Sequence, residues 1–206
     1  YGITAGGAVT DSGTQEISGI TTISASGQDV TLNTATNNFA DEVRITGAAV
    51  TVVDEDAIVL GASTVSGTYS VTAGGAITDE GTQEITGVTT LVAGSSNDIT
   101  LNTSTNNFAA AVVITSGNNV AITDEDAIIL GAATVSGTYG ITAGGAITDT
   151  GTQEIAGVTT LAAGSSNDIT LDTSTNNFAA AVGITSGRNV AITDEATIDL
   201  GASTVS

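Results

Sequence analysis

Apolar and polar residues alternate along many short stretches of this chain, which predicts β-strands. In residues 108–114, for example, Phe108, Ala110, Val112 and Ile114 would all lie on one face of a strand. Glycine, asparagine, aspartate and serine separate such stretches, and these residues favour turns. Because no segment keeps a period of 3.6 and β-branched residues are abundant, we predict an all-β protein.

The strand pattern is repeated in three long copies. The phrase YSVTAGGAITDEGTQEITG begins at Tyr69, and nearly the same letters begin at Tyr1 and at Tyr139. The copies therefore run over residues 1–68, 69–138 and 139–206. A tandem array of this kind predicts one continuous solenoid rather than three independent domains.

A shorter period lies inside each copy. Leu91, Ile114 and Ile141 each stand three positions before a glycine, and similar apolar residues recur at steps of 20 to 27 residues. We expect this apolar ladder to point inward and to stack turn on turn. Its members are Ile3, Ile23, Ile45, Val71, Leu91, Ile114, Ile141, Leu161 and Ile184.

The ladder predicts a β-solenoid of about nine rungs, each with three short strands, because neighbouring rungs can pair all their backbone groups. Three features of the rungs follow. Phe39, Phe108 and Phe178, each after an Asn-Asn corner, should lie inside. Corners such as Gly74-Gly75 should use residues that tolerate positive φ or close Asx turns. The longer step after Leu130 should form a bulge or a small flap. The alternative is a string of immunoglobulin-like sandwich domains, although these are usually longer and richer in aromatic residues.

Charge narrows the possible partners. The chain has 22 acidic and two basic residues, a net charge of −20, which disfavours binding to nucleic acids and to anionic membrane surfaces. The chain contains no run of about 18 apolar residues, so the sequence predicts no membrane-spanning helix. The chain contains no Cys and no His, so disulfides, thiol chemistry and imidazole ligands are excluded.

Two acidic clusters are weak candidates for calcium. They contain Asp54 and Asp56 in the first copy and Asp124 and Asp126 in the second, and hard cations take several carboxylate oxygens. The third copy breaks the pattern with Ala196, and neither an EF-hand loop nor a calcium-binding nonapeptide is present. We therefore expect solvated acidic corners, no dedicated metal site, and at most weak calcium binding.

We expect no enzyme activity and no cofactor. Arg44 and Arg188 occupy neighbouring places in the first and third copies, but the second copy has Val113 and Asn118 near there, so no repeated basic site exists. Glu16, Glu84 and Glu154 do recur, and we interpret them as surface charges. The pairs Thr21-Thr22, Thr89-Thr90 and Thr159-Thr160 recur too rarely to form an ice-binding array, and we interpret them as strand formers.

Two longer phrases carry a resemblance to a known family. SVTAGGAITDEGTQEITGVTTLVAGSSNDITL and NNFAAAVVITSGNNVAITDEDAIILGAATVSG resemble the repeats of very large bacterial surface proteins of the filamentous-haemagglutinin type. The resemblance covers the whole chain. It implies a right-handed parallel β-helix shaft, exported across the outer membrane and used for adhesion or for holding a distal tip away from the cell.

The functional expectation is therefore a structural shaft segment of an extracellular bacterial adhesin or surface fibre. The alternative is a solenoid module that itself binds glycans or proteins of a host or neighbouring cell. Both ends of the chain read like the internal copies, so we expect the segment to continue into further repeats or to stack end to end with identical segments.

Overall fold

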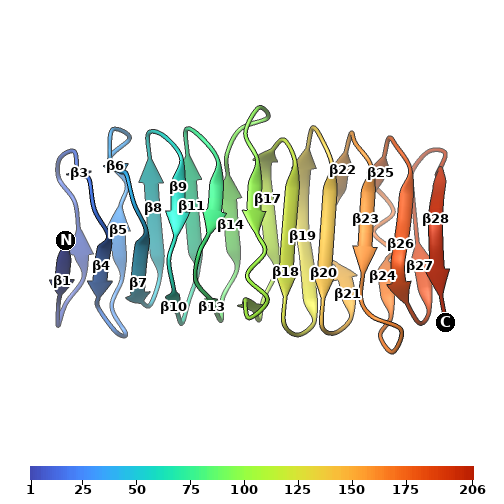
Figure 1. The fold of residues 1–206 in the computed structure, drawn as a ribbon, viewed down its shortest axis with the longest axis horizontal. Helices are drawn as coiled ribbons and strands as arrows, with labels where there is room; N and C mark the ends of the chain where they lie inside the picture. Colours follow the sequence, from blue (N-terminus) through green and yellow to red (C-terminus); the bar gives the residue numbers. More distant parts are fainter.

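The strands of this protein form a right-handed parallel β-helix of about ten turns, seen from the side in Figure 1. This computed structural model describes residues 1–206. Neighbouring strands pair in parallel throughout, and the predicted solenoid is confirmed. Parallel pairing also shows that the immunoglobulin-like alternative is wrong, because those sandwiches are antiparallel. The structure has no helix that is long and apolar enough to cross a membrane.

The strands belong to two long sheets and one short pair. The 14-stranded sheet contains β1 (Gly2–Thr4), β4 (Thr21–Ser24), β7 (Val43–Gly47), β9 (Ile58–Leu60), β10 (Ser63–Val65), β12 (Ile77–Asp79), β13 (Gln83–Ile85), β15 (Ile99–Leu101), β16 (Asn107–Phe108), β18 (Val120–Asp124), β20 (Tyr139–Ala143), β23 (Thr159–Ala162), β26 (Val182–Gly187) and β28 (Leu200–Val205). The 12-stranded sheet contains β2 (Val9–Thr10), β5 (Val30–Leu32), β8 (Val50–Asp54), β11 (Tyr69–Ala73), β14 (Thr89–Val92), β17 (Val112–Gly117), β19 (Ile128–Val135), β21 (Ile147–Asp149), β22 (Gln153–Ile155), β24 (Ile169–Leu171), β25 (Asn177–Phe178) and β27 (Val190–Ile192). The short pair is β3 (Glu16–Ile17) with β6 (Asn38–Phe39).

One hydrophobic core of 43 buried residues runs along the rod, from Val9 to Ile184. It follows from the alternation in the sequence, since every second strand residue points inward. Phe39, Phe108 and Phe178 are at most 2% exposed, so their predicted interior position is confirmed.

The apolar ladder is inward as predicted, but its register is wrong where one copy meets the next. Ile3, Ile23 and Ile45 do stack on one another. The next member, Val71, lies beside Val52 in the other sheet. The same break recurs between the second and third copies, where Ile141 lies beside Ile122 and not beside Ile114.

These breaks mean that one copy of the repeat spans about three and a half turns. Equivalent residues of successive copies therefore lie in opposite sheets: β1 and β20 belong to the 14-stranded sheet, whereas β11, which begins the second copy, belongs to the 12-stranded sheet. Two copies bring the chain back to the same face. The extra half turns explain why the rod has about ten turns and not nine.

The longer step after Leu130 contributes one of these half turns. Its residues as far as Val135 belong to β19, which pairs with β17 on one side and with β21 and β22 on the other. The register shifts twice along the β17–β19 pair. The segment is therefore an irregular, bulged strand and not a flap.

Glycines serve two different purposes at the corners. Gly94 has a φ of 81°, which a residue with a side chain rarely adopts. Gly74 does not have positive φ, so this corner does not use glycine's tolerance of that conformation. A Cβ on Gly74 would instead overlap the carbonyl oxygen of Glu55 in the preceding turn, so glycine is needed there for close stacking.

Candidate functional site

The two acidic clusters were the only candidate site in the sequence, and the structure divides each of them. Asp54 is 2% exposed and Asp124 is 1% exposed, while Asp56 and Asp126 lie on the surface. Each cluster begins at the last residue of β8 or β18 and continues into the corner that follows. Each candidate pair thus combines one buried carboxylate with one exposed carboxylate.

Both oxygens of the buried carboxylates are already occupied by backbone N–H groups. Asp54 Oδ2 accepts a hydrogen bond of 2.9 Å from the Phe39 amide, and Oδ1 accepts one of 2.9 Å from the Asp56 amide. Asp124 accepts the same bonds from the amides of Phe108 and Asp126, at 3.0 and 2.9 Å. These carboxylates join neighbouring turns, because the amide of each phenylalanine belongs to the turn below.

The third copy shows that this bonding needs only the first aspartate of the cluster. Asp194 accepts hydrogen bonds from the amides of Phe178 and Ala196, at 2.9 and 2.8 Å, although Ala196 replaces the second aspartate of the cluster. The structure brings no group of three or more acidic side chains together in a way that could hold a metal ion. Weak calcium binding stays a prediction, in which the exposed Asp56 and Asp126 would take part rather than the buried Asp54 and Asp124.

Burial raises the pKa of the Asp54 and Asp124 carboxyl groups, although the two backbone hydrogen bonds at each act in the opposite direction. The neighbouring acidic side chains of each cluster raise the pKa further. The hydrogen bonds thus offset only part of the free-energy cost of burying the two carboxylate charges. We therefore expect the stability of these two corners to depend on pH.

The two arginines form separate ion pairs on the surface. Arg44 of β7 bonds at 2.7 Å to Glu42, which precedes that strand, and Arg188, which follows β26, bonds to Asp168 at 2.8 Å. Hydrogen bonds from Arg188, and then from Asn189, lower the pKa of Asp168 to about 2. Glu16, Glu84 and Glu154 are exposed, in agreement with the surface position predicted for them.

The structure contains a buried polar network that the hydrophobic pattern of the sequence does not indicate. In the second copy, Asp79 Oδ2 accepts a hydrogen bond of 2.6 Å from Asn106, and Asn106 Oδ1 accepts one of 2.8 Å from the Gln83 amide. The first copy repeats the network with Asp11, Asn37 and Gln15, and the third with Asp149, Asn176 and Gln153. Their recurrence in all three copies is the signal that could have identified them.

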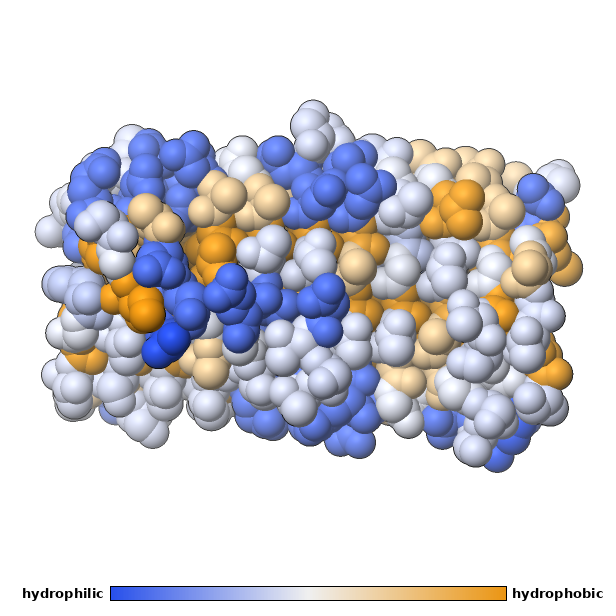
Figure 2. All heavy atoms as spheres, viewed as in Figure 1, coloured by the Kyte–Doolittle hydropathy of each residue, from blue (hydrophilic) through white to orange (hydrophobic).

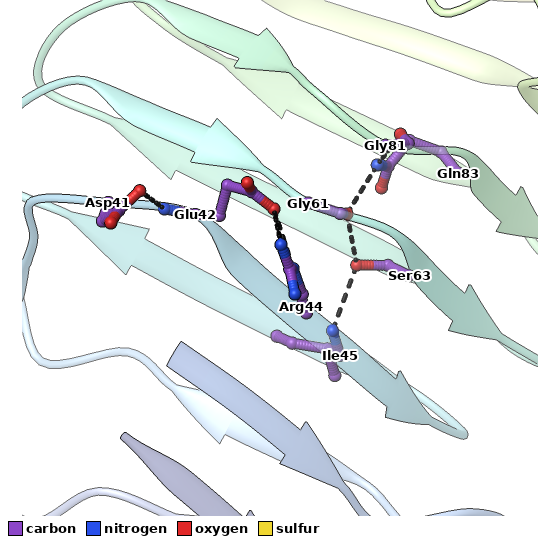
Figure 3. A network of polar contacts seen from close by, with 8 residues as sticks. All are labelled: Asp41, Glu42, Arg44, Ile45, Gly61, Ser63, Gly81 and Gln83. Carbon is purple, nitrogen blue, oxygen red and sulfur yellow. Dashed lines mark hydrogen bonds and ion pairs between the residues drawn. The ribbon is translucent and has the colours of Figure 1, made fainter. Parts of the chain in front are cut away.

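Gln83 extends this network across the boundary between two copies (Figure 3). Its side-chain amide donates to the carbonyl of Gly81 at 2.7 Å and to the carbonyl of Gly61, in the preceding copy, at 2.9 Å. Ser63 also donates to the Gly61 carbonyl and accepts from the Ile45 amide, both at 3.2 Å. Gln153 repeats the bond across the next boundary by donating to the Gly131 carbonyl at 2.7 Å.

On the face drawn in Figure 2, hydrophilic patches alternate with apolar patches along the length of the rod. The hollows lined mainly by apolar side chains lie at the two ends of the rod. One is lined by Tyr1, Ile3 and neighbouring residues, and the other by Ile192, Ile198, Leu200 and their neighbours. They are the open ends of the hydrophobic core.

Comparison with known proteins identifies a repeat family. A family model described as repeats of unknown function (DUF5649) matches residues 2–46, 47–115 and 117–185. The second and third matched stretches begin inside the copies of our division, but they have the same period. No curated protein and no solved structure matches the chain.

Proposed function

The chain belongs to the family of DUF5649 repeats, and we propose that it serves as a structural shaft segment of a large extracellular bacterial adhesin or surface fibre. Its work is to extend and display other parts of that protein. The resemblance of its repeats to filamentous-haemagglutinin-type shafts supports the cell-surface location. The proposed role needs no catalysis and no cofactor.

One observation carries the proposal: the hydrophobic core continues without interruption through both boundaries between copies. Strands of adjacent copies pair with three or more residues in each of two sheets, and Gln83 and Gln153 add side-chain bonds at the same places. A rod without a hinge suits mechanical extension. At about 4.8 Å per turn, ten turns give a length of roughly 48 Å.

Direct binding of glycans by the side of the rod has less support. Aromatic rings are the usual platforms for stacking against a sugar ring, and five of the six aromatic residues are at most 2% exposed. The exception, Tyr1, lies at the N-terminal end of the rod.

The test is to remove whole copies from the full-length protein on its native cell. One copy spans three and a half turns of about 4.8 Å each, so a shaft should shorten by about 17 Å for each copy removed. Electron micrographs of the cell surface would measure this length. Adhesion by the distal part should persist. A loss of adhesion in proportion to the copies removed, with the distal part still displayed, would instead favour direct binding by the solenoid.

A further inference from the structure

We propose that Asn102 is a site of N-linked glycosylation, at which a transferase attaches a sugar to the side-chain amide. Asn102 begins the tripeptide Asn102-Thr103-Ser104, and at no other asparagine of the chain does serine or threonine stand two positions later. Asn-x-Ser/Thr is the acceptor pattern for this modification in surface loops of secreted proteins. The inference therefore rests on the proposed cell-surface location and adds a covalent modification to the shaft.

The side-chain amide of Asn102 has no hydrogen-bond partner within the chain. Of the 13 asparagines in the sequence, ten use their side chains in hydrogen bonds to other residues. The three without such a bond are Asn33, Asn102 and Asn107. Alanine stands two positions after Asn33 and Asn107, so the acceptor pattern falls on one of the few unoccupied amides.

The tripeptide lies on the surface, in the loop between β15 and β16. Asn102 and Ser104 are exposed, whereas Thr103 between them is half-buried. This alternation turns the amide and the hydroxyl toward solvent together. A transferase can therefore reach both groups in the folded protein.

The backbone of this loop is fixed while the two side chains project from it. Asp79 Oδ1 accepts a hydrogen bond of 2.9 Å from the backbone N–H of Asn102, and Oδ2 accepts one of 3.3 Å from that of Thr103. The same carboxylate holds the fully buried Asn106 at the other end of the loop. A sugar on Asn102 would extend into solvent without breaking any bond of this network.

The other two copies have the same loop but lack one member of the tripeptide. In the first copy Ala35 takes the place of the serine, and in the third Asp172 takes the place of the asparagine. Backbone amides of these loops bond to Asp11 and Asp149, which correspond to Asp79. The three copies therefore differ in the acceptor groups and not in the way the loop is held.

The reaction joins Nδ2 of Asn102 to the anomeric carbon of a sugar. The donor is a sugar whose anomeric carbon is esterified to a diphosphate group. The bond between that carbon and the phosphate oxygen breaks, and the diphosphate leaves with the electron pair. Nδ2 gives up one of its two protons to a base of the transferase, so the amide is neutral before and after the reaction.

The test is mass spectrometry of the full-length protein purified from its native cell and digested with a protease that cleaves before aspartate. This digestion places Asn102 in the peptide 98–123 and Asn33 in the peptide 29–40. We expect the added mass of one or more sugar residues on Asn102, and no added mass on the peptide 29–40. A peptide 98–123 that occurs only with its unmodified mass would overturn the proposal.

A loss-of-site variant tests the role of the hydroxyl. Ser104→Ala should remove the sugar from Asn102, although the amide itself is unchanged. The fold should tolerate this change, because Ala35 occupies the same place in the first copy. Ser104→Thr should retain the sugar. A sugar that persists on Asn102 in the alanine variant would overturn the assignment to this tripeptide.

The other two loops allow a gain-of-site test. Ala35→Ser completes the tripeptide that begins at Asn33, and Asp172→Asn completes the one in the third copy. Each variant should carry a sugar on a peptide that is otherwise unmodified, 29–40 in the first case and 168–193 in the second. Failure of both variants to gain a sugar would overturn the claim that the tripeptide in this loop suffices.

These results are separable from the test of the shaft role. Protease added to intact cells reports whether the chain is on the surface, independently of any sugar. A chain on the surface with an unmodified Asn102 would overturn glycosylation and leave the shaft role intact. A modified chain that stays inside the cell would support glycosylation and overturn the proposed location of the shaft.

Discussion

Val52 and Val71 lie side by side in β8 and β11, although the tandem repeat makes Val71 the equivalent of Ile3 in the opposite sheet. The boundary between copies is therefore a half-turn offset and not a simple continuation. Its glycine, glutamine and apolar contacts hold the rod together where independent repeats would separate. Each of these contacts leads to a measurable expectation.

Phe108 fills the core at a corner of the solenoid and is 1% exposed. Phe108→Ala should lower the free energy of unfolding by about 3–5 kcal/mol, through lost burial and the cavity left behind. Val158→Ala, at a side chain that is 48% exposed, should change it by less than about 0.5 kcal/mol. Chemical denaturation measures both, and equal effects would show that the phenylalanine ring is not part of the core.

Gln83 and Gln15 form a matched pair, since only Gln83 bonds to a preceding copy. Gln83→Ala should cost about 1–3 kcal/mol, because it leaves the buried Gln83–Gly61 bond unmade. Gln15→Ala should cost less than about 0.5 kcal/mol. The comparison is best made by denaturation of dilute protein, and a larger cost at Gln15 would contradict the assigned role.

Gly87 and Gly19 are equivalent positions with different surroundings. A Cβ on Gly87 would overlap the carbonyl oxygen of Gly67, whereas nothing lies within 4 Å of a Cβ on Gly19. Gly87→Ala should therefore cost on the order of 1–3 kcal/mol through displaced backbone. Gly19→Ala should be neutral or slightly stabilising, because it restricts the unfolded chain. Thermal unfolding of the two variants decides the point.

The buried Asp54 and Asp124 should make stability depend on pH. Burial raises the pKa of both carboxyl groups, so the folded protein holds these protons more tightly than the unfolded chain, whose pKa is near 3.8. The free energy of unfolding should therefore increase as pH falls from about 7 through the raised pKa, and this gain should end near pH 3.8. Asp168 does not interfere in this range, because its pKa is lowered to about 2 and its contribution is lost only as pH falls toward that value.

The matched variants separate this effect from the general loss of negative charge on acidification. Asp54→Asn/Asp124→Asn and Asp56→Asn/Asp126→Asn change the net charge equally, but only the first pair removes buried groups. Denaturation at a series of pH values should give a shallower slope for the buried pair. Identical slopes would mean that the buried carboxylates titrate as they do in the unfolded chain.

At the candidate site, the sequence indicated the acidic residues but not their hydrogen-bond partners. Recurrence of Asp54 and Asp124 among other acidic residues suggested a solvated corner, although each aspartate continues the inward alternation of its strand. Asp54 and Asp124 accept hydrogen bonds from the amides of Phe39 and Phe108 in the turn below, which lie 15 and 16 residues earlier in the chain. The sequence gives no sign of the role of Gln83 for the same reason, since its second acceptor, the Gly61 carbonyl, is 22 residues away.

The sequence by itself determined the strands, the inward phenylalanines and the solenoid, because alternation and turn residues act within a few positions of the chain. Only the tertiary structure decided the phase of the repeat. A copy of about 70 residues is not a whole number of turns of about 20, so Val71 meets Val52 and the pattern changes sheets at each boundary. Stacking contacts between turns select that offset. The pattern of equivalent residues along the chain does not indicate which turn lies beneath which.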